Sequence, residues 1–129
     1  MQRTPLQIRF NDIDMLGHVN NVIFGHYYDT ARTDYFLNKT TYNPDFQKDQ
    51  KLIIMVHVEH DYLAPCFLTD TLFVETTLEK IGERSVHFLQ EIVDDKGIIR
   101  SRSRSVMSTF DTATGKSFPI KDEWEFFEQ

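Results

Sequence analysis

Several residue types that can do chemistry crowd into one short stretch near the start of the chain, RFNDIDMLGHVNN, from Arg9 to Asn21. It contains two carboxylates, a glycine, a histidine and two adjacent asparagines, which is more polar chemistry than a plain turn needs. An aspartate can attack a carbonyl carbon or activate water. The free N–H groups at the start of a helix can stabilise the oxyanion that forms. The stretch therefore contains the minimum chemistry for acyl transfer, with Asp12 or Asp14 as the carboxylate.

The same residues also have structural interpretations. Asp12 and Asp14 are separated by one residue, so in an extended strand only one of them could face a site. Asp and Asn are common turn and cap residues before a helix, Gly17 can simply supply a positive φ, and His18 can be a hydrogen-bonded loop residue. The spacing of Asp12, Asp14, His18 and His26 matches no recognised metal-ligand motif, and we expect no metal. From spacing alone, catalysis remains one of several hypotheses.

The surrounding pattern predicts the elements that position this stretch. Apolar and polar residues alternate over 6–10, which predicts a first strand. Apolar residues at spacings of three and four predict a helix from Val22 to Leu37, capped by Asn20 or Asn21. Gly25 within it suggests that another backbone passes close by. A polar loop over 38–50 precedes strands predicted at 52–63, 71–81, 85–94 and 98–110, and the tail KDEWEFFEQ could form a short amphipathic helix. This order predicts an α+β domain in which an antiparallel sheet wraps around one helix.

Length and composition restrict the class of protein. The 129 residues fit one domain spanning 1–129. A formal net charge of -6 argues against general affinity for nucleic acid or an anionic membrane surface. The one cysteine, Cys66, excludes an internal disulfide, and no apolar run is long enough to span a bilayer. The first residues lack the apolar region of a secretory signal, so we expect a cytoplasmic protein.

Two further polar groups need an interpretation. The alternating RSRSRS sequence puts Arg100, Arg102 and Arg104 on one strand face and serines on the other. A phosphate-binding stripe is possible, but we favour a solvated face whose arginines pair with Glu75, Glu79 or Glu91 across strands, while the small serines let the helix approach. In the 52–63 strand, alternation groups His57, Glu59 and Asp61 on one face as surface or interface contacts, with His60 facing the other way.

The stretch FNDIDMLGHVNNVIFGHYYDTAR closely resembles the motif of the hot-dog fold acyl-CoA thioesterases of the 4-hydroxybenzoyl-CoA thioesterase type. The likeness covers nearly the whole chain, because EHDYLAPCFLTDTLFVETTLEKIGERSVHFLQEI and MSTFDTATGKSFPI are similar to later strands of that family. The resemblance implies a hot-dog fold, with a sheet wrapped around the central helix. It also implies that subunits pair side by side as a homodimer or dimer of dimers, with active sites at the interface.

The resemblance also assigns catalytic roles. Asp14 matches the family's catalytic carboxylate, which acts as a nucleophile or as a general base on water. Asn21, or Val22 beside it, lies where backbone N–H groups at the helix start would polarise the thioester carbonyl. Gly17 would let the loop close over the acyl end, and His18 would orient water or the loop.

Substrate contacts follow from the same resemblance. Arg84 and Ser85 match a region that often contacts the coenzyme A nucleotide in the family, and Tyr62 is in register with the family's second strand. The implied reaction is hydrolysis of an acyl-CoA thioester to a free acid and coenzyme A. It needs no cofactor, because coenzyme A is part of the substrate.

Two alternatives stay open. One is a hot-dog protein that binds an acyl-CoA or an acyl carrier protein without hydrolysing it, although a pure binder would not need a carboxylate aimed at the thioester. The other is an acyl-carrier-protein thioesterase. The plant enzymes of that kind share GHVNN and carry Asp, Asn and His at alternate positions. Here these positions hold Asp14, Leu16 and His18, so the asparagine is missing.

Overall fold

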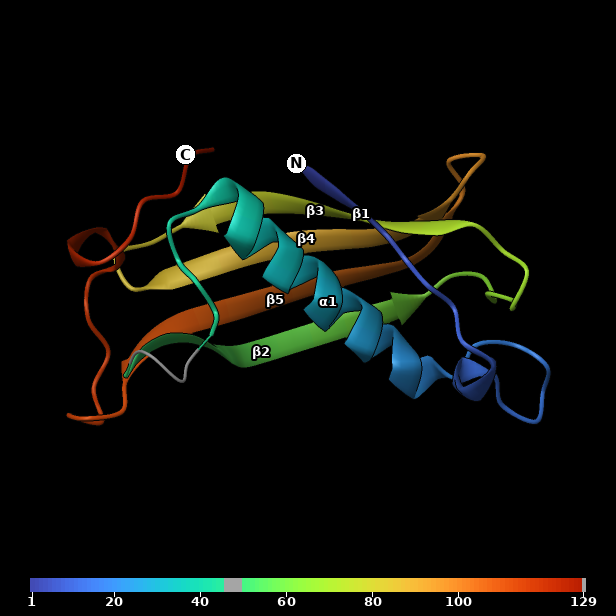
Figure 1. Ribbon diagram of the computed structural model, residues 1–129, viewed down its shortest axis with the longest axis horizontal. Coiled ribbons are helices and arrows are strands. Elements are labelled where there is room, and N and C mark those ends of the chain that lie inside the picture. Colours follow the sequence, from blue (N-terminus) through green and yellow to red (C-terminus); the bar gives the residue numbers. More distant parts are fainter. Residues whose placement is uncertain (46–49, 129) are drawn as a thin grey trace.

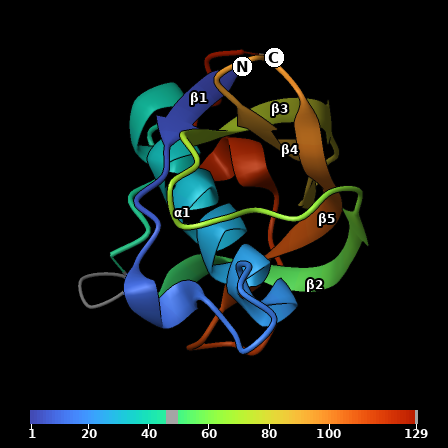
Figure 2. The same cartoon turned by 90° about the vertical axis from the view of Figure 1, so that its right-hand side faces the viewer.

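The structure is a computed structural model that describes residues 1–45 and 50–128. Within these residues, helix α1 (Asn21–Lys39) lies against one face of a five-stranded antiparallel sheet of order β1-β3-β4-β5-β2 (Figure 1). The strands are β1 (Gln2–Pro5), β2 (Lys51–Tyr62), β3 (Leu72–Ile81), β4 (Ser85–Asp94) and β5 (Ile99–Asp111). The sheet curves around the helix when viewed along the strands (Figure 2). The predicted α+β hot-dog fold is confirmed.

Helix α1 forms where the three-and-four spacing predicts it. Its N-cap is Asn20, whose side-chain oxygen accepts a hydrogen bond from the Val22 N–H at 3.0 Å. Its buried face includes Phe24, Tyr27, Tyr28, Ala31 and Tyr35. These side chains form the core together with the inward residues of the sheet, because both elements must bury an apolar face.

Gly25 lies within the helix as expected, but the predicted reason for it, a second backbone passing close by, is wrong. A Cβ atom at this position would meet the Nε2 atom of His60 at 3.9 Å, which is an ordinary contact with a side chain. No backbone of another segment approaches within that distance in the described structure. The glycine therefore leaves room beside an imidazole on β2.

The predicted first strand at 6–10 is also wrong. The observed strand, β1, pairs with β3 from Gln2↔Thr76 to Pro5↔Phe73. Beyond Pro5 only the Leu6 N–H continues the pairing, donating to the Leu72 carbonyl at 3.0 Å, because β3 begins at Leu72. The alternation over 6–10 reflects packing without a partner strand, since Leu6 and Ile8 pack against the core while Phe10 is 80% exposed.

The faces of β5 follow the favoured interpretation. Ser101, Ser103 and Ser105 are buried, and the Tyr28 hydroxyl of α1 donates to the Ser101 Oγ at 2.6 Å. On the outer face, Arg102 pairs with Glu91 at 2.8 Å and Arg104 with Glu79 at 3.4 Å. Arg100 differs from the expectation, because it pairs with Asp94 and Asp70, each at 2.9 Å.

The C-terminal tail is not the amphipathic helix that its sequence suggests. Only Ile120–Asp122 forms a short 3-10 helix. The chain then becomes extended, so that Phe126 bridges to Thr40 and its ring packs against Phe36 with ring centroids 6.2 Å apart. Burying this aromatic ring outweighs the weak local preference for a helix. In the predicted loop over 38–50, α1 continues to Lys39, and residues 46–49 lie outside the described residues.

Different segments of the chain lie at the two ends of the sheet. The start of α1, the loop before it and the end of β2 lie together at one end, whereas the β3–β4 turn and the end of α1 lie at the other (Figure 1). Among the described helices, none is long and apolar enough to cross a bilayer.

Candidate active site

The loop before α1 is a closed turn. The Asp14 N–H donates to the His18 carbonyl at 3.0 Å, and the Gly17 N–H donates to the Asp14 carbonyl at 3.0 Å. Ile13 and Val19 form an antiparallel bridge at its base. Gly17 has a φ of 84°, a region in which a side chain is strained. The glycine therefore lets the chain reverse between Asp14 and His18.

This turn holds the Asp14 carboxylate by one oxygen. Its Oδ1 accepts a hydrogen bond from the Leu16 N–H at 2.9 Å and lies 3.9 Å from the His18 Nδ1. Among the described residues, none donates a hydrogen bond to its Oδ2. The side chain is 23% exposed. One carboxylate oxygen is therefore anchored while the other remains available to a ligand.

The start of α1 offers one unused donor. The Val22 N–H is taken by the Asn20 side chain, and the Ile23 N–H donates to the Asn20 carbonyl at 2.9 Å. Within the described part of the chain, the Asn21 N–H has no acceptor, as expected for the first residue of a helix. It lies at the positive end of the helix dipole. Of the two predicted oxyanion donors, the geometry leaves the Asn21 N–H free and the Val22 N–H engaged.

A hollow of about 240 Å³ brings three predicted residues together. His18, Asn21 and Tyr62 line it, with Val19, Phe24, Leu63, Ala64 and Pro65. The Tyr62 hydroxyl donates to the Asn21 carbonyl at 3.3 Å, and its ring packs against Phe24 with ring centroids 5.3 Å apart. Asp14 adjoins the hollow through His18. The end of β2 and the start of α1 thus form the two walls of a candidate acyl-transfer site.

Arg84 and Ser85 do not join this site within one chain. They lie at the β3–β4 turn, at the end of the sheet opposite the loop that carries Asp14 (Figure 1). The Arg84 guanidinium donates to the Ser117 carbonyl at 3.0 Å, and the Ser85 hydroxyl lies 3.5 Å from the His87 Nε2. The resemblance that assigned Arg84 and Ser85 to the substrate does not indicate how far they lie from Asp14.

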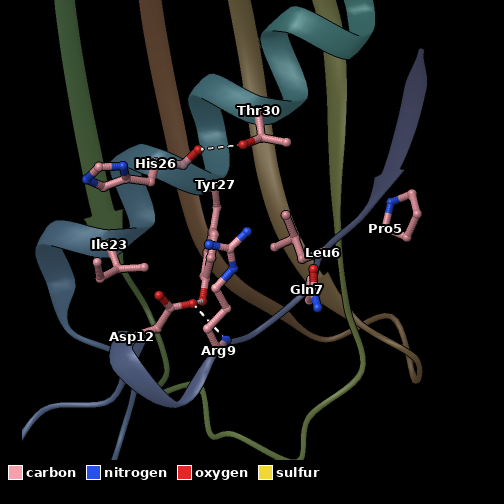
Figure 3. A pocket seen from close by; sticks show the side chains of 9 residues that line it. All are labelled: Pro5, Leu6, Gln7, Arg9, Asp12, Ile23, His26, Tyr27 and Thr30. Carbon is pink, nitrogen blue, oxygen red and sulfur yellow. Dashed lines mark hydrogen bonds between the residues drawn. The ribbon is translucent and has the colours of Figure 1, made fainter.

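A larger hollow, of about 490 Å³, lies on the other side of the first turns of α1 (Figure 3). Asp12 lines it, and its Oδ2 accepts a hydrogen bond from the Tyr27 hydroxyl at 2.6 Å. The hollow contains none of Asp14, His18 and Asn21, so its greater volume does not make it the better candidate. Asp12 and Asp14 do occupy different environments, but the reason is not strand alternation: Asp12 ends a short 3-10 helix, Phe10–Asp12, and Asp14 lies in the turn that follows it.

His60 is a neighbour of the site that the motif does not reveal. As predicted, it faces away from the exposed His57–Glu59 pair. Its Nδ1 lies 2.8 Å from the Ser103 Oγ, and its ring stacks on Tyr28 with ring centroids 5.0 Å apart. Burial and the nearby Arg32 lower its pKa, so the imidazole is neutral at neutral pH.

Among the described residues, the side chains that could bind a metal are not clustered, and the one cysteine is buried. In residues 1–45 and 50–128, no three His, Cys, Asp or Glu side chains gather as they would around a metal ion. Cys66 is fully buried, and burial raises the pKa of its thiol to about 11. A neutral buried thiol is a poor nucleophile.

These features define an α+β hot-dog domain in which the turn that holds Asp14 directly precedes the N-terminus of α1. The family model described as the thioesterase-like superfamily matches residues 8–125. The chain therefore belongs to the thioesterase-like superfamily, and the predicted family is confirmed. At the level of the family, this membership supports hydrolysis of an acyl-CoA thioester.

Individual relatives agree with this assignment. The acyl-CoA thioesterase YbgC of Haemophilus influenzae is 26% identical over 90 residues, which cover 69% of this chain and 66% of that protein. A thioesterase from Thermus thermophilus, whose crystal structure contains coenzyme A and zinc, is 28% identical with a TM-score of 0.77, over 92% of this chain and 89% of that one. The DHNA-CoA thioesterase of Staphylococcus aureus has a TM-score of 0.85 over 94% of this chain and 81% of that one. Its 18% identity supports the fold alone.

Proposed function

We propose that this protein is an acyl-CoA thioesterase, with Asp14 as nucleophile or general base and the Asn21 N–H as oxyanion donor. One observation carries the proposal. The anchored Asp14 carboxylate lies 3.9 Å from His18, which lines the same hollow as Tyr62 and as Asn21, the residue whose N–H is unused. Membership of the thioesterase-like superfamily supports it independently.

Either role of Asp14 gives a balanced reaction. As a nucleophile, its Oδ2 adds to the thioester carbonyl carbon, and the electron pair of the C=O bond moves onto oxygen, where the Asn21 N–H stabilises it. Collapse of this adduct expels the coenzyme A thiolate, and water then hydrolyses the anhydride to the free acid and the Asp14 carboxylate. As a general base, Asp14 instead removes a proton from the water that adds to the same carbon, and the adduct then expels the coenzyme A thiolate to leave the acid, while the proton held by Asp14 passes to the thiolate.

The proposal includes a homodimer formed through β2. This strand is at the edge of the sheet, with β5 as its neighbour on one side. Its exposed apolar residues are Ile54 (37%), Val56 (58%) and Val58 (42%). A long edge strand with an apolar surface is a template for pairing with a second copy. A larger assembly, the dimer of dimers, remains a prediction.

Antiparallel pairing of two β2 strands would also account for Arg84 and Ser85. The β3–β4 turn lies at the end of the sheet where β2 begins, and the Asp14 loop lies where β2 ends (Figure 1). A two-fold axis through paired β2 strands would therefore bring the partner's β3–β4 turn to the end of the joint sheet that carries Asp14. The coenzyme A nucleotide would then contact the second subunit.

The primary test is saturable hydrolysis, by the purified protein, of members of a panel of short, long and aromatic acyl-CoAs. Asp14→Asn should lower kcat at least a hundredfold, about 3 kcal/mol of transition-state stabilisation, because the amide can neither attack nor accept the proton. Thiol release is the readout.

A matched control is Asp111→Asn. Asp111 accepts the Ala113 N–H through its Oδ1 at 2.8 Å, a turn contact like that between Asp14 and Leu16, but at the opposite end of the sheet. It should keep wild-type kcat. Full activity of Asp14→Asn, or equal losses in both variants, would refute the assignment of Asp14.

A further inference from the structure

The Asp12 side chain connects two segments that form the site. Its Oδ2 accepts hydrogen bonds from the Tyr27 hydroxyl at 2.6 Å and from the Arg9 N–H at 3.0 Å (Figure 3). Tyr27 lies in the second turn of α1 and is 6% exposed, so its ring is fixed by the core. The Asp12 carboxylate is therefore attached to a rigid part of the helix.

The Asp12 backbone makes the second connection. Its carbonyl accepts a hydrogen bond from the N–H of Asn20, the N-cap of α1, at 2.9 Å. The loop that carries Asp14 begins directly after Asp12 and ends at Asn20. Both ends of this loop are thus held at the same point, and Tyr27 ties that point to the helix.

Backbone hydrogen bonds close the base of this loop, where the Val19 N–H also donates to the Cys66 carbonyl at 2.7 Å, but the tip of the loop is exposed. Met15 is 98% exposed and Leu16 is 73% exposed at its tip, so apolar packing contributes little there. A hydroxyl that donates to a carboxylate forms a short, charge-assisted bond, which is stronger than a neutral one. Burial and this bond raise the pKa of Tyr27, so its hydroxyl remains a donor at neutral pH.

We propose that Asp12 and Tyr27 are positioning residues, whose hydrogen bond sets the distance between the Asp14 carboxylate and the Asn21 N–H. This inference rests on the proposed thioesterase function. A small displacement of an attacking group lowers the rate strongly, because the reacting atoms must approach within near-contact distance and in line. Substrate affinity, which depends on the whole coenzyme A surface, changes much less.

The first experiment compares Tyr27→Phe with Tyr35→Phe. Each variant loses a hydroxyl that donates to a carboxylate, because the Tyr35 hydroxyl donates to Glu128 at 2.8 Å near the other end of the same helix. Tyr27→Phe should lower kcat about tenfold with KM within about threefold of wild type, whereas Tyr35→Phe should keep both. A merely structural role would instead lower the thermal midpoints of both variants without this split between kcat and KM.

A second pair of variants separates positioning from chemistry. Asp12→Asn retains a side-chain oxygen that can accept the Tyr27 hydroxyl, so it should keep most of the wild-type kcat and an unchanged pH profile. Asp12→Ala should lose as much as Tyr27→Phe. A loss in Asp12→Asn as large as that in Asp14→Asn would overturn the proposal, since it would make Asp12 a proton-transfer group.

Amide hydrogen exchange tests the link without any substrate. The Asp14, Gly17 and Asn20 amides are hydrogen-bonded in the loop. They should exchange about tenfold faster in Tyr27→Phe than in Tyr35→Phe. Equal exchange, or wild-type kcat in Tyr27→Phe, would overturn the positioning role. Absence of turnover by the wild-type protein would refute the thioesterase proposal instead, and exchange would still decide whether Tyr27 orders the loop.

Discussion

At the residue scale, the interior contains a charged group, Arg32, that pairs with the neutral Gln90 and, through its Nη2, with the Asp29 carboxylate. Arg32 is 5% exposed, and its Nη1 donates to the Gln90 Oε1 at 2.8 Å. The Gln90 amide in turn donates to the Tyr28 carbonyl at 3.1 Å and to the Thr76 Oγ1 at 3.0 Å. Burial lowers the Arg32 pKa, while the adjacent Asp29 acts in the opposite direction. Gln90 thus joins α1 to β3 and β4 through one polar network.

Removing the Gln90 amide should therefore destabilise the fold. Gln90→Met keeps a similar volume but leaves the Arg32 guanidinium with an unpaired donor in the core. We expect the free energy of unfolding to fall by about 3 kcal/mol. Urea denaturation measures this change, and Gln7→Met at an exposed position should change it by less than about 0.5 kcal/mol. Equal midpoints for the two variants would contradict this account of the network.

At the element scale, the β4–β5 hairpin is closed by a single carboxylate. The Oδ1 of Asp94 accepts the Lys96 and Ile98 N–H groups, each at 2.9 Å, and its Oδ2 accepts two hydrogen bonds from Arg100. Gly97 supplies the positive φ, 80°, that the turn requires. The strands predicted at 85–94 and 98–110 place a turn between residues 94 and 98, and its position is confirmed. Hydrogen bonds from the Ile98 N–H, the Arg100 guanidinium and the Lys96 N–H hold the pKa of Asp94 below its usual range.

This shift predicts how stability depends on pH. Because the folded-state pKa is lowered, the Asp94 contribution is fully present above the ordinary aspartate pKa of about 3.9, and it is lost as pH falls through the lower folded value. Asp94→Asn should be less stable than wild type at neutral pH and should lose less stability on acidification. Urea midpoints at a series of pH values from neutral to strongly acidic measure this slope, which Asp95→Asn should leave unchanged. A wild-type slope in Asp94→Asn would contradict the prediction.

At the scale of the whole molecule, the proposed pairing through β2 would determine whether one chain alone can form the complete site. The proposed site lies where β2 ends, and the predicted nucleotide contacts lie at the far end of the same chain. Pairing through β2 would bring the two together, so assembly and activity are expected to depend on each other. The outer arginines of β5 are each paired with a carboxylate, Arg100 with Asp70, Arg102 with Glu91 and Arg104 with Glu79.

A charge on this edge should separate the subunits. Val58→Lys adds a cation to an exposed position on β2, where burial against a second copy would be costly. We expect sedimentation velocity to show a dimer for the wild type and a monomer with reduced activity for the variant. Ile98→Lys, at a 54% exposed position in the β4–β5 turn, should remain dimeric. A wild-type monomer with full activity would disprove pairing as a requirement.

The sequence by itself determined the elements and the loop motif. Helix α1 and the four later strands follow from spacings of a few residues, which depend on local backbone geometry, and the sequence limited the N-cap to Asn20 or Asn21. The motif around Asp14 likewise identified the family, which the match over residues 8–125 confirms. The roles of Asp14, Gly17 and His18 remain predictions, as does the cytoplasmic location.

Only the tertiary structure decided how distant segments meet. It ended β1 at Pro5, because β3 begins at Leu72 and offers only the Leu72 carbonyl beyond that point, and it extended the tail to bury Phe126. It left the Asn21 N–H free and joined Asp12 to Tyr27, and it separated Arg84 from the loop of Asp14 by the length of the sheet. Segments far apart in the chain compete for hydrogen-bond partners and for buried surface, and these outcomes depend on that competition. The spacing of residues along the sequence contains only local information, so it cannot predict them.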